Sequence, residues 1–153
     1  MNYLEKQVDL FKEYRDLTVK NPYLVHAISA DFALGAGIAF TFNYYFSMRS
    51  RLFGTYPGYL NKYIREEIKG DSLKVGDVFN LVTKTNCCDK PTYENLTKAL
   101  LKLKEQVTKL EIKYLLMPKI GCGIDGLKWE KVSSIIKDIF EDVETNIIVC
   151  YLV

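Results

Sequence analysis

The chain has 153 residues, of which 48% are apolar and 26% are charged, as is usual for one folded domain. Its 21 basic and 19 acidic residues give a formal net charge of +2, which argues against a dedicated nucleic-acid-binding protein. No run approaches the roughly 20 apolar residues of a membrane span, and no secretory signal opens the chain, so we expect a cytoplasmic protein without membrane contact.

Strand-like and helix-like segments alternate from the start of the chain. Residues 3–10 predict a weak strand near a sheet edge, and the apolar run at 23–28 predicts a strand covered on both faces. Residues 36–47 carry apolar side chains at four-residue spacing and predict a helix, and the tyrosine-rich residues 56–70 predict another. Residues 70–79 then indicate a turn and a return strand.

The second half of the chain continues this alternation. Further strands are predicted at 78–83, 114–117 and 147–152, and helices at 92–110 and 128–142. Thr92 is suited to cap the first of these helices, whose apolar stripe consists of Leu96, Leu100, Leu103, Val107 and Leu110. The alternation predicts one α/β domain over residues 1–153, with a parallel or mixed sheet between helices.

Glycines and a lysine follow the predicted strands at the edge where ligands of open α/β sheets bind. Gly35 and Gly37 follow the second strand, Lys84 follows the strand at 78–83, and residues 118–126 follow the next. Glycine loops that open helices suit phosphate, because the backbone comes close and its N–H groups and the helix dipole favour an anion. Two such loops predict a site for two phosphates or for one diphosphate held between them. Tight turns are the alternative, since neither loop matches a known nucleotide fingerprint.

The single histidine and the four cysteines give little support to metal or cysteine chemistry. His26 lies inside an apolar strand and is interpreted as a core residue. Cys87 and Cys88 are adjacent and lack metal-ligand spacing, so we expect no metal and no cofactor. Cys122, between two glycines, matches a nucleophile elbow only in part. We favour a small residue in a crowded loop over a nucleophile with His26 as its base.

Lys84 and Asp125 each allow two interpretations. Lys84 is an exposed surface lysine or a nucleophile, and Asp125 caps the helix that follows it or takes part in catalysis. Over one cleft, the lysine could attack a carbonyl-like or anomeric carbon while the aspartate relays protons. The residue types alone leave both interpretations open.

Three blocks of sequence resemble a known family. These are "HAISADFALGAGIAFTF" at 26–42, "LVTKTN" with "KPTYENL" within 81–96, and "MPKIGCGIDGLKWEKVSSII" at 117–136. They resemble the macrodomain family, and within it the terminal ADP-ribose glycohydrolase (TARG-type) branch. The resemblance implies a three-layer α/β/α macrodomain fold with a mixed central sheet, and a monomer that binds ADP-ribose in a cleft at the strand ends.

The resemblance also implies roles for single residues. In this branch a lysine attacks the anomeric carbon of the distal ribose and an aspartate assists release, and Lys84 and Asp125 stand at those positions. The implied ADP-ribose contacts are Asp9 and Leu10, with Phe11, near the adenine; Ser29, Gly35, Ala36, Gly37 and Ile38 in the first loop; Gly121, Cys122, Gly123 and Ile124 in the second; and Tyr151 and Leu152 beside the adenine. Thr85 departs from the pattern, because a second basic residue is expected after the lysine.

The resemblance implies an ADP-ribosyl hydrolase or deacylase. Its expected substrates are ADP-ribosyl esters of glutamate or aspartate on proteins, and O-acetyl-ADP-ribose, with ADP-ribosylated nucleic acid ends as a further candidate. Two alternatives are a non-catalytic ADP-ribose-binding module and an ADP-ribose 1″-phosphate phosphatase.

Overall fold

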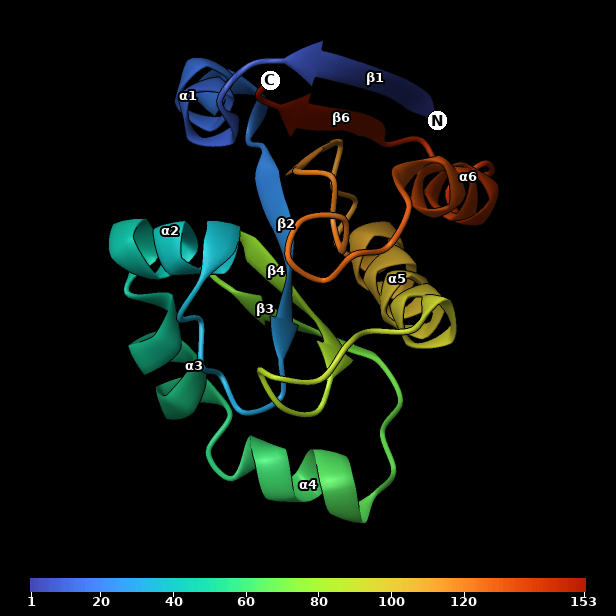
Figure 1. The fold of residues 1–153 in the computed structure, drawn as a ribbon. Helices are drawn as coiled ribbons and strands as arrows, with labels where there is room; N and C mark the ends of the chain where they lie inside the picture. The colour runs from blue at the N-terminus through green and yellow to red at the C-terminus, as the bar shows by residue number, and fades with distance from the viewer.

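The computed structural model describes residues 1–153 and contains one six-stranded mixed sheet (Figure 1). Its strands are β1 Asn2–Gln7, β2 Tyr23–Ser29, β3 Asp71–Val75, β4 Val78–Lys84, β5 Tyr114–Met117 and β6 Asn146–Tyr151. Their order across the sheet is β1-β6-β5-β2-β4-β3. Only β3 is antiparallel to its neighbour. The carboxyl ends of the other five strands therefore lie along the same edge.

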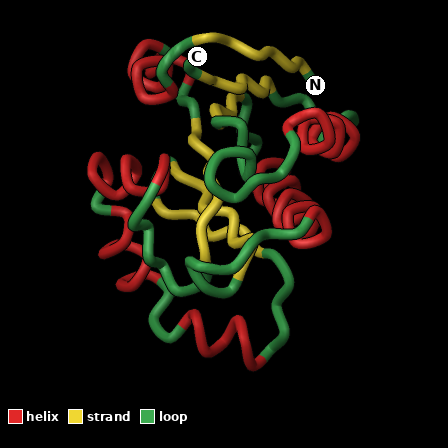
Figure 2. The backbone as a smooth tube through the Cα atoms, in the orientation of Figure 1, coloured by secondary structure: helices red, strands yellow, loops and turns green.

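Helices cover both faces of the sheet and complete three layers. They are α1 Leu10–Asp16, α2 Gly37–Phe46, α3 Met48–Thr55, α4 Tyr59–Arg65, α5 Tyr93–Lys109 and α6 Trp129–Ile139. Apolar side chains of α1 to α4 form one core cluster with the sheet, and those of α5 and α6 form a second. Figures 1 and 2 show α2 and α3 on one side of the strands and α5 and α6 on the other. The predicted α/β/α arrangement is confirmed.

Strand β4 shows why the sequences of the central strands are continuous apolar runs. Val78 and Val82 pack in the core beneath α1 to α4, while Phe79 and Leu81 pack in the core beneath α5 and α6. Because successive side chains of a strand point to opposite faces, a strand covered on both faces needs apolar residues at consecutive positions.

The α5 helix begins where its sequence predicts. Thr92 caps it, with its side-chain oxygen accepting a hydrogen bond from the Asn95 N–H at 3.0 Å. Four of the five residues of its predicted stripe are buried. The prediction is wrong for Leu110, which follows the last helical residue and is 49% exposed.

The start of the chain differs from its prediction. The predicted strand at 3–10 ends at Gln7, and a short helix, α1, begins at Leu10. Asp9 accounts for the change, because its carboxylate accepts a hydrogen bond from the Lys12 N–H at 3.0 Å and caps the helix. The edge position of β1 is confirmed.

The region between α2 and β3 contains more breaks than its periodicity predicts. Helix α3 was not predicted, and Ser47, with φ of 50°, separates it from α2. The helix predicted at 56–70 is shorter, running only over α4. Gly58 and Glu67 hold left-handed conformations on either side of it, which ends the helical hydrogen bonding. The predicted turn and return strand is confirmed as the β3–β4 hairpin.

No helix in this fold combines the length and the apolar character that a membrane crossing requires.

Candidate active site

A pocket of about 350 Å³ lies at the carboxyl ends of β2, β4 and β5. Strands β2 and β4 are neighbours, and Ser29 pairs with Lys84 in their register. The third side comes from the loop after β5. Ten of the predicted site residues line this pocket: Ser29, Gly35, Ala36, Gly37, Ile38, Lys84, Gly121, Gly123, Ile124 and Asp125. The parallel topology thus brings together segments that lie far apart in the sequence.

Six predicted ligand contacts lie outside the pocket wall: Asp9, Leu10, Phe11, Cys122, Tyr151 and Leu152. Asp9 is engaged as the cap of α1, and Leu10 is buried in the core beside it. Tyr151 lies next to one end of the pocket, since the Lys119 ammonium is 4.4 Å from its ring centroid and Lys119 lines the pocket. Leu152 is 71% exposed. The adenine roles of these residues stay predictions.

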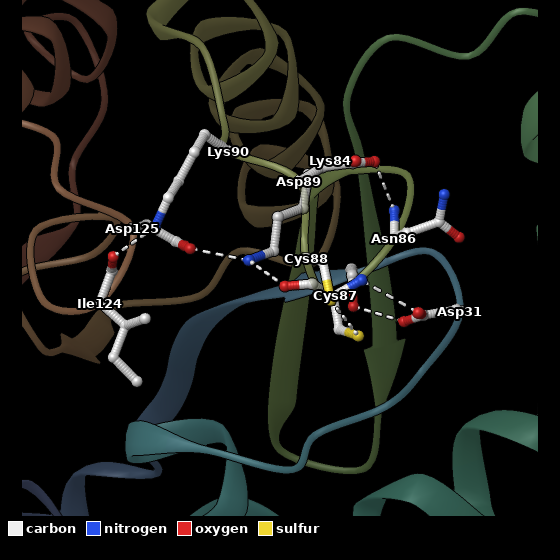
Figure 3. Close-up of polar contacts among 10 residues, drawn as sticks. Asp31, Lys84, Asn86, Cys87, Cys88, Asp89, Lys90, Ile124 and Asp125 are labelled. Carbon is white, nitrogen blue, oxygen red and sulfur yellow. Dashed lines mark hydrogen bonds and ion pairs between the residues drawn. The ribbon is translucent and has the colours of Figure 1, made fainter.

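Lys84 and Asp125 form an ion pair inside the pocket. The Lys84 Nζ lies 2.7 Å from Asp125 Oδ1, and the two side chains are only 13% and 18% exposed. The same ammonium donates a second hydrogen bond to the Cys87 carbonyl at 3.2 Å (Figure 3). Lys84 is therefore not a freely solvated surface lysine.

Asp125 does not cap the following helix. The cap position of α6 is Lys128, and no side chain closes that helix end. The loop before it is closed by its own turns, in which Gly126 N–H donates to Gly123 C=O at 3.2 Å and Leu127 N–H to Gly121 C=O at 2.8 Å. The loop does lead to a helix near the predicted start, but the interpretation of Asp125 as its cap is wrong, because the carboxylate faces Lys84 instead.

Two further side chains, Asp31 and Lys90, position the loops around the ion pair. Lys90 Nζ donates to the Ile124 carbonyl at 2.9 Å, next to Asp125 in the chain (Figure 3). Asp31 Oδ2 accepts from the Cys87 N–H at 3.0 Å, and its Oδ1 accepts from Ser29 Oγ at 2.5 Å. Hydrogen bonds thus attach the loop between β4 and α5 to the loop after β2 and to the loop after β5.

Hydrogen bonding decides the ionisation of Asp31. Burial disfavours its charged form, but hydrogen bonds from Ser29, Cys87 and Ala33 outweigh burial and hold its pKa below the usual range. Sequence reasoning missed Asp31, Lys90 and Lys119. Asp31 had a signal, because a polar S-x-D follows the apolar strand directly; the two lysines had none that distinguishes them from surface lysines.

The first glycine loop presents free backbone donors to the pocket. Helix α2 begins at Gly37, its cap residue is Ala36, and no side chain accepts from its first N–H groups. Such groups and the helix dipole attract an anion. Gly37 has φ of +62°, and a Cβ there would lie 3.4 Å from Ile124 Cδ1. The two glycine loops therefore approach each other across the pocket.

The structure argues against a cysteine nucleophile. Burial raises the pKa of the Cys122 thiol, and its Sγ donates to the Ile120 carbonyl at 3.4 Å. His26 is fully buried, stacks on Phe42 and lies 2.6 Å from Asn80 Oδ1. Phe42 belongs to the core beneath α1 to α4, whereas Cys122 packs against the other core. The sheet separates the two groups, and the interpretation of His26 as a core residue is confirmed.

Comparisons with known proteins agree with this geometry. The family model "Macro domain" matches residues 65–136. The ADP-ribose glycohydrolase OARD1 of Bos taurus is 39% identical over 127 residues, which cover 82% of this chain and 79% of that protein. The protein of the same name from Homo sapiens is 37% identical over 131 residues, with 85% and 82% covered. The macrodomain of Thermus aquaticus DarG has a TM-score of 0.72 at 20% identity, covering 97% of both chains.

Proposed function

The chain belongs to the macrodomain family, and from this premise we propose that it is a hydrolase of ADP-ribose modifications. Its proposed substrates are ADP-ribosyl esters of glutamate or aspartate on proteins, and O-acetyl-ADP-ribose. Two relatives that cover most of the chain are named ADP-ribose glycohydrolases, which supports hydrolysis over binding alone.

The observation that carries this proposal is the ion pair of Lys84 and Asp125. An amine and a carboxylate 2.7 Å apart, both largely shielded from solvent, can exchange a proton directly. They lie in the same pocket as the two glycine loops. A pocket that only bound a diphosphate would need the loops but not this pair.

The pocket geometry supports one orientation of the substrate. The free N–H groups at the start of α2 and the backbone of Gly121 and Gly123 would hold the diphosphate. The distal ribose would then lie toward Lys84 and Asp125. The adenine would lie toward Tyr151 and Asp9, where the Lys119 side chain links the pocket to the Tyr151 ring.

The proposed reaction has two stages. Asp125 accepts a proton from Lys84, the amine attacks C1″ of the distal ribose, and the bond from C1″ to the acyl oxygen breaks. Asp125 returns the proton to the leaving carboxylate. Asp125 then removes a proton from water, the oxygen bonds to C1″, and the C1″–Nζ bond breaks. The sum is one ester and one water converted into ADP-ribose and a carboxylic acid, with Lys84 regenerated.

Replacement of the lysine tests the proposal. The substrate is a peptide that carries ADP-ribosyl-glutamate, and the readout is release of ADP-ribose. We expect Lys84→Ala to lower turnover by about a thousandfold or more, equivalent to about 4 kcal/mol of barrier. Lys104→Ala is the matched control, because Lys104 also pairs with an aspartate at 2.7 Å, but outside the pocket.

Two results would contradict the proposal. Full turnover by Lys84→Ala would exclude the lysine mechanism. A wild-type protein that binds ADP-ribose by calorimetry, yet leaves the glutamate ester and O-acetyl-ADP-ribose intact, would be a binding module instead.

A further inference from the structure

Cys87 and Cys88 form a pair of exposed thiols at the pocket, and the proposed hydrolysis does not use their sulfur atoms. Their Sγ atoms lie 3.7 Å apart, and Cys87 lines the pocket wall. The other two cysteines differ, since Cys122 is half-buried and Cys150 is buried. Burial raises the pKa of both of those thiols, that of Cys150 to about 12, which makes them poor nucleophiles at neutral pH.

A tight turn holds the two thiols side by side. Cys87 and Cys88 are the central residues of a turn in which the Asp89 N–H donates to the Asn86 carbonyl at 3.0 Å. The Asp89 carboxylate accepts from the Asn86 N–H at 2.9 Å and closes the same turn. Figure 3 shows the two sulfur atoms next to each other and joined by a dashed line. A thiol that has reacted with an oxidant therefore has the second thiol within reach.

The backbone of this turn is part of the catalytic hydrogen-bond network. The Cys87 carbonyl accepts the second hydrogen bond of Lys84, at 3.2 Å. The Cys87 N–H donates to Asp31 at 3.0 Å, and Asp31 in turn accepts from Ser29 of the pocket wall. Any change in the peptide between the two cysteines is thus transmitted to the ammonium that is paired with Asp125.

We propose that Cys87 and Cys88 are a thiol modification site, which a peroxide converts into a disulfide between adjacent residues, and that this bond weakens the active site. The effect on turnover rests on the hydrolase function proposed above. The existence of the thiol site does not rest on that function, because it depends on the exposure and spacing of the two sulfur atoms.

The reaction consumes one peroxide and leaves two waters. The Cys88 thiolate attacks one peroxide oxygen, an S–O bond forms, the O–O bond breaks, and hydroxide leaves. The Cys87 thiolate then attacks the Cys88 sulfur, the S–S bond forms, and the S–O bond breaks to release a second hydroxide. The two protons lost by the thiols convert both hydroxides into water. The hydrogen bond to Cys88 and the charge of Asp31 raise the pKa of the Cys87 thiol, and the same products form if the two cysteines exchange roles.

Closure of the bond must deform the turn. The sulfur atoms have to approach from 3.7 Å to about 2.05 Å. Residues joined by a trans peptide have Cα atoms about 3.8 Å apart, below the roughly 4.4 Å at which ordinary disulfides begin. The strain moves the Cys87 peptide away from Lys84, and a strained, exposed disulfide is also easily reduced again. The modification is therefore reversible.

The test treats the protein with hydrogen peroxide and measures intact mass, peptide mass and hydrolysis of the ADP-ribosyl ester. In the wild type we expect the loss of two hydrogen atoms, mapped to the peptide of Cys87 and Cys88. Turnover should fall about tenfold, as for one lost hydrogen bond to a charged group, and dithiothreitol should restore it. Cys88→Ser should keep basal turnover and resist peroxide. Cys122→Ser should lose the same fraction of its own untreated turnover as the wild type loses.

Several outcomes overturn the proposal. They are equal inactivation of wild type and Cys88→Ser, a disulfide between two chains, and an adjacent disulfide that leaves turnover unchanged. If reduced protein hydrolyses no ester, the hydrolase proposal fails separately, and the peptide mass alone then decides. Loss of two hydrogen atoms from the peptide of Cys87 and Cys88 supports the site, whereas no such loss refutes it.

Discussion

Substitution of Asp125 by asparagine separates catalysis from binding at this site. Asparagine has the same shape, and its amide oxygen can still accept the hydrogen bond that Lys84 Nζ donates to Asp125 Oδ1 at 2.7 Å. The amide cannot take up a proton from the lysine. The substitution therefore removes the proposed proton relay while the diphosphate loops keep their backbone geometry.

The size of the effect follows from the position of the pair. At 2.7 Å, two unit charges attract each other by about 6 kcal/mol when the effective dielectric constant is about 20, as near a protein surface. Asparagine removes this attraction and the proton transfer that depends on it. A positioned acid–base group contributes about 10²- to 10⁴-fold to rate, or about 3 to 5 kcal/mol. We expect Asp125→Asn to lose kcat in this range, with KM unchanged within about threefold.

The assay is steady-state release of ADP-ribose from an ADP-ribosyl-glutamate peptide, with calorimetric binding of ADP-ribose beside it. Asp142→Asn is the matched control, because Asp142 pairs with Lys104 at the same 2.7 Å on a solvent-exposed part of the surface. The reasoning is refuted if Asp125→Asn keeps kcat within about threefold of wild type, or if it loses ADP-ribose binding as completely as turnover.

Two further predictions concern stability. Gly121 has φ of +74°, and a Cβ there would lie 2.9 Å from Leu127 Cδ1, whereas Gly123 has open space around it. We therefore expect Gly121→Ala to lower the free energy of unfolding, measured with urea, by about 1 to 2 kcal/mol. Gly123→Ala should lower it by less than about 0.5 kcal/mol. Equal effects of the two substitutions would contradict this explanation. Burial lowers the pKa of His26 from 6.5 to about 4, against the opposing effect of the hydrogen bond that its Nε2 donates to Asn80 Oδ1. As the pH falls, the unfolded state therefore binds a proton at His26 before the folded state does. The stability associated with neutral His26 is present above pH 6.5 and is lost as pH falls toward 4, by up to about 3 kcal/mol; a urea titration over this range in which His26→Gln has the same slope as wild type would disprove the assignment.

The sheet and the second helical layer could be predicted from sequence because their signals are local. The apolar runs of β2, β4, β5 and β6 and the stripe of α5 reflect residues that face a core on fixed periods of two or 3.6. The breaks between α2, α3 and α4 could not be predicted in this way. The break after α2 depends on left-handed Ser47, and the early end of α4 depends on left-handed Glu67; no periodicity marks either residue. The short α1 was missed because its cap residue, Asp9, follows a strand without any glycine or proline between them.

The candidate site likewise has features that the sequence could predict and features that it could not. The sequence by itself determined which loops follow which strands, and hence that Lys84 and the glycine loops would share one edge of a parallel sheet. Only the tertiary structure decided that Asp125, 41 residues from Lys84, turns toward its ammonium rather than toward the start of α6. Only the tertiary structure placed Asp31 against the Cys87 backbone, 56 residues away. The physical reason is that hydrogen-bond partners distant in sequence depend on the crossing of loops, and side-chain periodicity carries no record of such crossings.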